Sequence, residues 1–175
     1  TWLSTGGVFP AGLKKRILDQ WPDMRIFDFF GMTEMCPLMT FLSPRDMLEK
    51  PNSVGMEFPF VEMRLVDARD REVGVGEVGE GAYRGPTVMK EYYKKPEATA
   101  ESMKDGWFHG GDLLFKDEDG FYNIVDRKKD MIVSGAENVY PVEVENAILS
   151  NEKVLECAVI GVPDEKWGET VKAIV

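Results

Sequence analysis

The segment from Gly31 to Glu34 combines three features that a phosphate group and its metal ion require. Gly31 lets a ligand approach the backbone, because glycine has no side chain. The hydroxyl of Thr33 can donate a hydrogen bond to a phosphate oxygen, and the carboxylate of Glu34 can bind Mg²⁺, which prefers hard oxygen ligands. Thr33 could equally be the N-cap of a short helix, which is a common role for threonine. The segment alone leaves both interpretations open.

A second group of candidate residues begins at Asp112, which follows two glycines and precedes an apolar run. A carboxylate there can accept hydrogen bonds from both hydroxyls of a ribose, but a turn aspartate bonded to its own backbone is the simpler alternative. Arg127 follows the next apolar run, and its guanidinium group could bind hydroxyls or phosphate. Residues 134–138 place a flexible Gly135 among polar side chains. They could also form a plain strand–helix loop.

The remaining reactive side chains indicate little chemistry of their own. His109 is the only histidine, and no Ser or Cys partner for a nucleophilic pair is in view. Cys36 and Cys157 form no C-x-x-C pair, so a zinc site is not indicated and both are interpreted as core thiols. The net charge of −10 argues against a general partner of nucleic acid or of anionic membranes.

The sequence also bears on the cellular location of the protein and on whether the chain is a segment of a larger one. No apolar run approaches the roughly 20 residues that a membrane-spanning helix needs. The low cysteine content fits a reducing compartment, and we expect a cytoplasmic protein. The chain opens on Thr1 and closes on an apolar run, which suggests an internal or truncated segment of a larger protein.

Two elements would position the Gly31–Glu34 segment. Residues 10–21 predict an amphipathic helix, and residues 24–31 predict a buried strand that ends at Gly31. One face of the helix would carry Leu13, Ile17 and Leu18, and the other would carry Lys14 and Lys15. The carboxyl end of a strand is where α/β folds bind ligands.

The middle of the chain changes to frequent glycines and alternating polarity. Residues 61–67 predict a strand, residues 73–85 a tight hairpin or bulged ribbon, and residues 113–125 a hairpin. A short helix begins at Pro96. This pattern indicates an antiparallel, β-rich unit.

The last part predicts a small α/β unit. A short strand at residues 131–133 precedes a helix that starts at Pro141. The inward positions of this helix would be Val144, Ala147 and Ile148. An apolar strand at residues 154–164 would end in a Gly-Val-Pro-Asp turn, and residues 170–175 would begin a third strand.

Six stretches, taken in order, resemble one family: "STGGVFP", "DFFGMTE", "GEVGEGAYRGPTVMKEYYKKPEATAES", "DGWFHGGDL", "DRKKDMI" and "SGAENVYPVEVE". The family is the adenylate-forming synthetases, which include acyl-CoA synthetases, luciferases and peptide-synthetase adenylation domains. The resemblance covers nearly the whole chain. It implies the end of a large N-terminal domain (an α/β subdomain edge and a distorted antiparallel β-barrel) followed by the start of a small α+β domain. The implied limits are 1–54, 55–125, a hinge at 126–130, and 131–175.

The resemblance implies a two-step reaction with ATP, Mg²⁺ and coenzyme A. A carboxylate attacks the α-phosphate of ATP to give an acyl-adenylate, and a thiol then takes the acyl group after the small domain has rotated. The "SGAENVYPVEVE" loop resembles acyl- and aryl-CoA synthetases, so a fatty or aromatic acid is the expected substrate, fatty slightly ahead. An adenylase that loads a carrier protein and a non-catalytic binding module are the alternatives. Assembly into a homo-oligomer is left open.

The resemblance assigns the nucleotide site residue by residue. Gly6 and Gly7 match a glycine-rich stretch that borders the acyl and adenine pockets. Phe30, followed by Gly31, would lie against adenine, and Asp28 would be near its amino group.

The resemblance assigns the other roles in the same way. Thr33 would contact the AMP phosphate, Glu34 would hold Mg²⁺, and Asp112 would bind the ribose hydroxyls with Arg127 beside it. Lys129 matches the hinge position of the catalytic cycle. The loop lining the pantetheine tunnel matches Ser134, Gly135 and Ala136.

Two departures from the family pattern stand out. Gly110 occupies the position of a usual threonine in the Thr-Gly-Asp motif. The phosphate loop, expected before Thr1, and the catalytic lysine, expected after Val175, are not in this sequence. We therefore expect the segment alone to be inactive.

Overall fold

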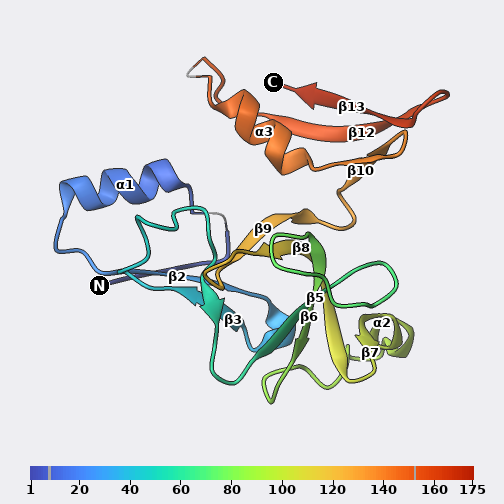
Figure 1. Cartoon of the computed structure of the whole chain (residues 1–175), viewed down its shortest axis with the longest axis horizontal. Coiled ribbons are helices and arrows are strands. Elements are labelled where there is room, and N and C mark those ends of the chain that lie inside the picture. The colour runs from blue at the N-terminus through green and yellow to red at the C-terminus, as the bar shows by residue number, and fades with distance from the viewer. Residues whose placement is uncertain (8, 152) are drawn as a thin grey trace. The chain divides into compact units, whose positions relative to one another are not determined.

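The computed structural model describes residues 1–7, 9–151 and 153–175. The chain divides into two compact units (Figure 1). Unit 1 comprises residues 1–110 and 114–124, and unit 2 comprises residues 111–113 and 125–175. The finer limits drawn from the family pattern, at residue 55 and at the 126–130 hinge, stay predictions.

The first sheet of unit 1 has four strands in the order β1-β2-β3-β4. They are β1 (Trp2–Thr5), β2 (Ile26–Gly31), β3 (Leu38–Leu42) and β4 (Met56–Glu57). β1 and β2 are parallel, with Thr5 opposite Phe29, and the other pairs are antiparallel. The β2–β3 register shifts between Phe30 and Gly31, so the bulge falls at the end of the predicted strand.

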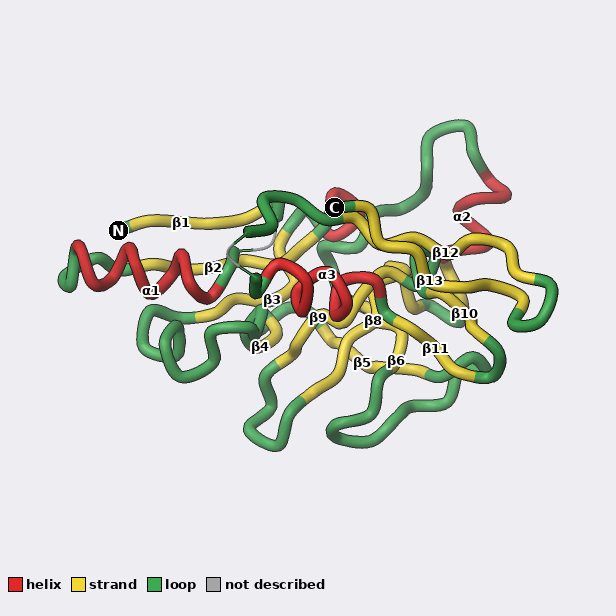
Figure 2. Tube along the Cα trace, turned by 90° about the horizontal axis from the view of Figure 1, so that it is seen from above, coloured by secondary structure: helices red, strands yellow, loops and turns green. Residues whose placement is uncertain are grey.

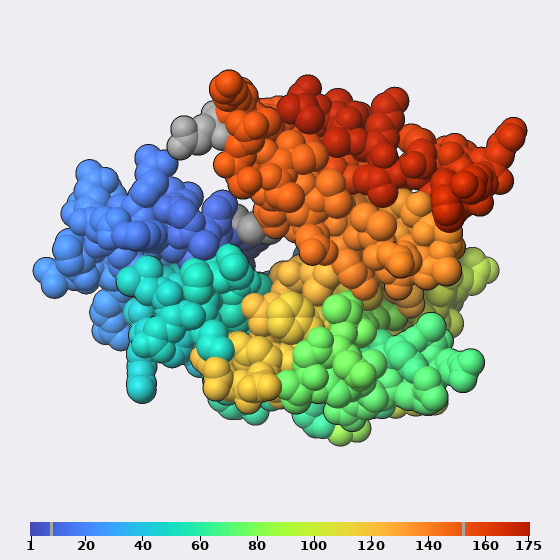
Figure 3. Space-filling model, turned by 45° about the horizontal axis from the view of Figure 1, so that its top comes forward, coloured from blue at the N-terminus to red at the C-terminus, as the bar shows by residue number. Residues whose placement is uncertain are grey.

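Helix α1 (Ala11–Gln20) packs on this sheet and forms part of the surface of unit 1, blue in Figure 3. Its Ile17 joins a buried cluster with Ile26, Leu42 and Met47. The helix was predicted correctly, and Ile17 and Leu18 pack against the core as expected, but Leu13 and Lys14 were placed on the wrong faces. Lys14 is 2% exposed and Leu13 is 43% exposed. A lysine can bury its aliphatic stem when its ammonium group finds partners, and hydrophobic periodicity does not register such partners.

A second sheet has the order β5-β6-β8-β7, and β9 pairs with β8. Most of it belongs to unit 1, whereas residues 111–113 of β8 and 125–127 of β9 belong to unit 2. Its strands are β5 (Glu62–Val66), β6 (Gly79–Arg84), β7 (Met103–Lys104), β8 (Trp107–Lys116) and β9 (Tyr122–Arg127). Helix α2 (Pro96–Ser102) begins at its proline as expected. The β8–β9 hairpin confirms the prediction for residues 113–125. Only the second half of residues 73–85 is a strand, because a turn that includes Gly76 at φ +80° interrupts the ribbon.

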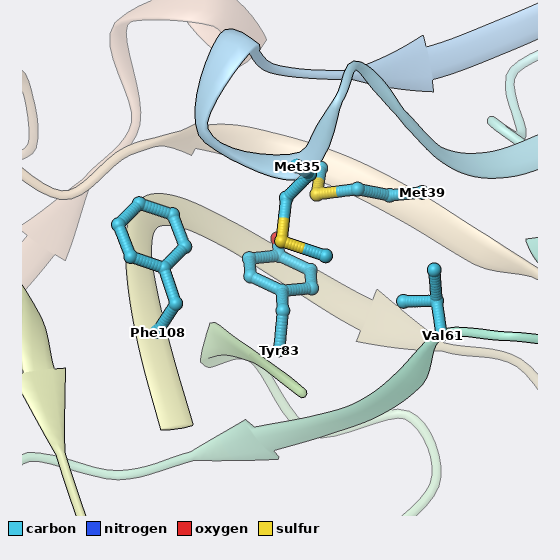
Figure 4. Close-up of a cluster of buried hydrophobic side chains, with 5 residues drawn as sticks. All are labelled: Met35, Met39, Val61, Tyr83 and Phe108. Carbon is cyan, nitrogen blue, oxygen red and sulfur yellow. The ribbon is translucent and has the colours of Figure 1, made fainter. Parts of the chain in front are cut away.

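The core of unit 1 on this side is built around Tyr83, which is fully buried. Figure 4 shows Met35, Met39, Val61 and Phe108 gathered around its ring. Two glycines make room for that ring. A Cβ at Gly81 would lie 2.1 Å from the Tyr83 hydroxyl oxygen, and a Cβ at Gly110 would lie 2.7 Å from Tyr83 Cε2. Tyr83 therefore requires a residue without a side chain at both positions.

Unit 2 contains a four-stranded sheet in the order β11-β10-β13-β12 (Figure 2). The elements are β10 (Ile132–Ser134), β11 (Glu137–Val139), α3 (Pro141–Leu149), β12 (Ala158–Asp164) and β13 (Gly168–Ile174). Residues 161–164, expected to turn, continue β12 and pair with β13. The expected inward position Ala147 is exposed. Residues 134–138 form a β10–β11 hairpin, so the strand–helix loop interpretation is wrong.

Helix α3 is anchored at its start by Asp126, which is 5% exposed. Asp126 Oδ2 accepts a hydrogen bond from the backbone N–H of Val142 at 3.1 Å, and Oδ1 accepts one from the N–H of Arg127 at 2.7 Å. The first N–H groups of a helix lack partners within the helix, so a carboxylate is a favourable acceptor there.

Among the helices in the described ranges, none is long and apolar enough to cross a bilayer.

Candidate active site

The corner after β2 places Thr33 and Glu34 on one tight turn. Thr33 is exposed and begins the 3₁₀ helix η1 (Thr33–Met35). The N-cap position belongs to Met32, and within the described residues no side chain caps this helix. The helix-cap interpretation of Thr33 is therefore wrong, and its hydroxyl lies at the surface of unit 1. A Cβ at Gly31 would lie 1.5 Å from the carbonyl oxygen of Pro37, so the chain's own reversal also requires glycine there.

Glu34 is half-buried and is held from a distant part of unit 1. The hydroxyl of Tyr92 donates a hydrogen bond to Glu34 Oε1 at 2.8 Å, and the N–H of Met89 donates one to the Glu34 carbonyl at 2.7 Å. Burial, together with the hydrogen bond to Glu34, raises the pKa of Tyr92 to about 12. Tyr92 is therefore a neutral donor at physiological pH, and it fixes one carboxylate oxygen while the other can still bind a ligand.

The carboxyl ends of β1 and β2 bring four predicted nucleotide residues to one sheet edge. Gly6 and Gly7 follow β1, and Phe30 and Gly31 close β2. The Thr5–Phe29 register makes these two segments neighbours, because parallel strands end at the same edge. A Cβ at Gly6 or Gly7 would meet none of the described atoms within 4 Å, so the backbone is accessible there. Phe30 is half-buried and packs against the Tyr83 cluster.

Asp28 lies two residues before Phe30 on the same face of β2 and is 7% exposed. Its Oδ2 atom lies 3.0 Å from Nζ of Lys14, a residue of α1. Sequence reasoning missed this partner because it placed Lys14 on the outer face. The ion pair gives β2 a buried negative charge with a fixed counter-charge next to the Phe30 position.

In unit 2, the structure brings Asp112 and Arg127 together. Arg127 Nε lies 3.8 Å from Asp112 Oδ1, and the N–H of Lys128 donates to the Gly111 carbonyl at 2.8 Å. Asp112 lies within β8, so the turn-aspartate alternative is wrong. Its side chain is 15% exposed, whereas that of Arg127 is 66% exposed. A carboxylate beside an exposed guanidinium group can bind vicinal hydroxyls and a nearby phosphate.

The other residues predicted in unit 2 lie on exposed turns. Lys129 lies in the turn after β9, and Gly135 and Ala136 form the turn between β10 and β11, directly after Ser134. Gly135 has φ +66°, and its N–H donates to the Trp167 carbonyl at 2.7 Å. A Cβ there would lie 3.0 Å from the Trp167 ring. Both backbone conformation and space therefore favour glycine at this turn.

His109 is buried in β8 between two carboxylates. Its Nε2 atom lies 3.6 Å from Asp70 Oδ1, and its Nδ1 atom lies 3.6 Å from Glu80 Oε2. These distances are too long for hydrogen bonds. No described serine or cysteine is bonded to it, so the geometry offers no nucleophile for it to activate.

Two side chains with contacts to the candidate site were not found from the sequence, Lys14 and Tyr92. Lys14 lies in an amphipathic helix pattern, where a lysine is usually solvated. Tyr92 lies in a polar loop, 58 residues from its partner Glu34. Neither position carries a local signal, because each role arises only from a long-range contact.

Comparison with known proteins identifies the family. The family model described as AMP-binding enzyme matches residues 1–93, and the model of the AMP-binding enzyme C-terminal domain matches residues 143–175. The chain belongs to the AMP-binding enzyme family. The resemblance drawn from the six sequence stretches is thereby confirmed.

Curated AMP-binding relatives match along the whole chain. A feruloyl-CoA synthase from Amycolatopsis sp. is 46% identical over 175 residues, which is 100% of this chain and 35% of the relative. A long-chain-fatty-acid–CoA ligase from Salmonella typhimurium is 42% identical over 176 residues, which is 99% of this chain and 31% of the relative. The chain thus spans about a third of the length of the curated relatives it matches.

Solved AMP-binding structures share the fold. An o-succinylbenzoate-CoA synthetase from Bacillus subtilis, in complex with an acyl-adenylate intermediate, has a TM-score of 0.90 and 36% identity, and the match covers 98% of this chain and 35% of that one. A structure of the same synthetase with ATP and magnesium has a TM-score of 0.89 and 34% identity, with 99% and 36% covered. The predicted fold class, the end of the large domain followed by the start of the C-terminal domain, is confirmed.

Proposed function

We propose that the protein carrying this chain is an ATP-dependent acid–CoA ligase. The observation that carries the proposal is the edge formed by β1, β2 and η1, where accessible glycines, an aromatic ring, an exposed hydroxyl and an anchored carboxylate meet within unit 1. These are the groups needed to bind a base, a phosphate and a metal ion. Relatives named as CoA synthase and CoA ligase support the same activity.

In the first step, a substrate carboxylate oxygen attacks the α-phosphorus of ATP. An oxygen–phosphorus bond forms, the bond to pyrophosphate breaks, and acyl-AMP results. We assign Thr33 to the phosphate, Phe30, Gly6 and Gly7 to adenine, and Asp112 with Arg127 to the ribose. These residues position the reactants and spread the phosphate charge, and none becomes covalently bound.

Glu34 is the residue we assign to Mg²⁺. Mg²⁺ in nucleotide sites is held by one or two carboxylates, while phosphates and water complete its shell. Glu34 fits because Tyr92 occupies only one of its oxygens. No group of three metal-ligating side chains occurs within the described residues, which suits an ion that arrives with ATP. When bound, the ion neutralises phosphate charge.

In the second step, the sulfur of coenzyme A attacks the acyl carbon and AMP leaves. We assign Ser134, Gly135 and Ala136 to the pantetheine path and Lys129 to a hinge between the two steps. Lys129, Gly135 and Ala136 lie on exposed turns, which suits segments that change neighbours during a reaction. A fatty acid is the substrate we favour, with an aromatic acid second, and we place the enzyme in the cytoplasm.

The test uses the full protein that carries this chain, incubated with ATP, Mg²⁺, coenzyme A and a mixed pool of carboxylic acids. Mass spectrometry of the products gives the result. We expect an acyl-CoA, whose mass identifies the acid. Acyl-AMP without a thioester would mean that the acyl acceptor is a carrier protein and not coenzyme A. The absence of any product with every acid in the pool would overturn the proposal.

A further inference from the structure

Among the described residues of unit 1, the Lys14–Asp28 ion pair is the most deeply buried contact between oppositely charged side chains, and no role has been assigned to Lys14. The side chain of Lys14 is 2% exposed and that of Asp28 is 10% exposed. Burying two charges costs several kcal/mol per ion unless geometry and further bonds compensate, so apolar residues would serve a merely structural role at least as well. The pair therefore calls for a reason beyond stability.

Lys14 is fixed from three directions. Its Nζ lies 3.0 Å from Asp28 Oδ2 and donates a hydrogen bond to the Pro51 carbonyl at 2.9 Å. It also lies 5.4 Å from the centre of the Phe9 ring, in the range of a cation–π contact. The ammonium group thus joins α1, β2 and the segment after β3 at one point. Its position leaves Asp28 little freedom to rotate.

One carboxylate oxygen of Asp28, Oδ1, is not used by the ion pair with Lys14. The ion pair involves Oδ2, and the described residues give Oδ1 no hydrogen-bond donor. Strand alternation puts Asp28 and Phe30 on one face of β2, and the Thr5–Phe29 register brings Gly6 alongside. A buried carboxylate with an unused oxygen next to a candidate base-stacking position can accept a hydrogen bond from a ligand.

We infer that Lys14 is a positioning residue for purine selection, acting through Asp28. This inference rests on the proposed function, because it needs a purine nucleotide beside Phe30. A carboxylate accepts a hydrogen bond from the amino group of adenine and repels the carbonyl oxygen that guanine carries in its place. Lys14 holds the Asp28 carboxylate in one orientation through the 3.0 Å contact between its Nζ and Asp28 Oδ2. Without that contact the carboxylate can rotate away from the base, and discrimination between the amino group and the carbonyl oxygen weakens.

The test compares Lys14→Met with Lys15→Met in the full protein. Lys15 is the neighbouring helix residue, but its ion pair with Asp19 is at the surface, with side-chain exposures of 68% and 63%. For Lys14→Met we expect the KM for ATP to rise about tenfold while the KM for the acid stays within about twofold. The preference for AMP over GMP, measured by calorimetric binding, should fall about tenfold. Lys15→Met should change neither value.

A double variant separates positioning from general stability. If Lys14 acts through Asp28, then Lys14→Met should add no further loss of AMP preference in an Asp28→Asn background, because the two residues act as one unit. Full additivity of the two changes would overturn the inference. If Lys14→Met alone fails to fold, Lys14→Gln replaces it as the uncharged variant, both alone and in the Asp28→Asn background, so that additivity can still be measured.

The outcomes distinguish this inference from the proposed function. Failure of the unmodified protein to bind AMP would overturn both. Normal AMP binding by the unmodified protein, with an unchanged AMP-over-GMP ratio in Lys14→Met, would overturn the role of Lys14 alone.

Discussion

Two candidate residues of unit 1 and two of unit 2 are held in opposite ways. In unit 1, Asp28 and Glu34 are buried or half-buried, and each is held by a side chain from a distant segment, Lys14 or Tyr92. In unit 2, Gly135 and Lys129 lie on exposed turns. Under the proposed function, Asp28 and Glu34 direct charge toward a nucleotide, which favours rigid surroundings, whereas Gly135 and Lys129 meet an incoming partner, which favours exposure. Substitutions should therefore separate the two steps.

The largest effect should come from Glu34→Gln in unit 1. The amide oxygen can still accept the Tyr92 hydrogen bond, so the fold should be retained, but the charge that we assign to Mg²⁺ binding is lost. We expect ATP–pyrophosphate exchange to fall at least ~100-fold, with little change in the thermal midpoint. Glu91→Gln, at an exposed carboxylate nearby, is the control. Near-normal exchange in Glu34→Gln would remove Glu34 from the metal site.

Gly110→Thr tests how tightly the side chains of unit 1 pack around Gly110, and it changes no charged group. The variant restores the family's usual threonine, but its Cβ would lie 2.7 Å from both Met32 Cε and Tyr83 Cε2. We expect a loss of about 2 kcal/mol in the free energy of unfolding, measured with urea. Gly12→Ala in α1 is the control, because its Cβ meets none of the described atoms within 4 Å. Equal stability of Gly110→Thr and the unmodified protein would mean that Met32 and Tyr83 move aside at little cost.

Gly135→Ala should affect unit 2 alone. We expect thioester formation to fall about tenfold, because the new methyl group disturbs the turn against Trp167, while pyrophosphate exchange stays unchanged. The strain at positive φ should cost about 1 kcal/mol of stability. Gly168→Ala shares this strain at φ +78°, but its Cβ meets none of the described atoms within 4 Å. If both variants slow thioester formation equally, the loop has no specific role in that step.

The smallest effect should come from Tyr92→Phe, which removes one support of Glu34 and leaves its charge. We expect adenylation to fall about threefold, with a higher Mg²⁺ requirement. The pKa of Tyr92 is raised to about 12, above its unfolded value of about 10. Its contribution to stability should therefore be complete below pH about 10 and be lost as the pH rises through the folded value. A stability difference from the unmodified protein that disappears already near pH 8 would contradict this.

Local patterns in the sequence were sufficient for most elements. Proline at the first helical position located α2 and α3, and apolar runs around Asp-Glu-Asp-Gly located the β8–β9 hairpin. Turn chemistry was less decisive. Pro163 suggested a turn, but it lies within β12, opposite Glu169 of β13. A proline can occupy a strand position where no ladder donor is needed.

Site residues that lie within contiguous family motifs could be predicted from the sequence. Side chains that contact those residues from distant segments of the chain could not. Asp112 and Arg127 were expected together and lie 3.8 Å apart. The buried state of Lys14 could not be read from helical periodicity, which scores a lysine by its charge and ignores its apolar stem. Gly110, which occupies the position of the family's usual threonine, was not explained from the sequence. The structure relates this glycine to the space that Met32 and Tyr83 occupy.

The contacts of Tyr122 bear on the order in which the chain can fold during synthesis. The Tyr122 carbonyl accepts hydrogen bonds from the Ser53 hydroxyl and the Val54 N–H, and its own N–H donates to the Gly55 carbonyl. These bonds join segments 69 residues apart. During synthesis, unit 1 cannot complete its folding until residue 122 has left the ribosome. The apolar surfaces that these bonds help to cover stay exposed until then. In unit 2, β12 and β13 are neighbours along the chain, so their pairing needs no such wait.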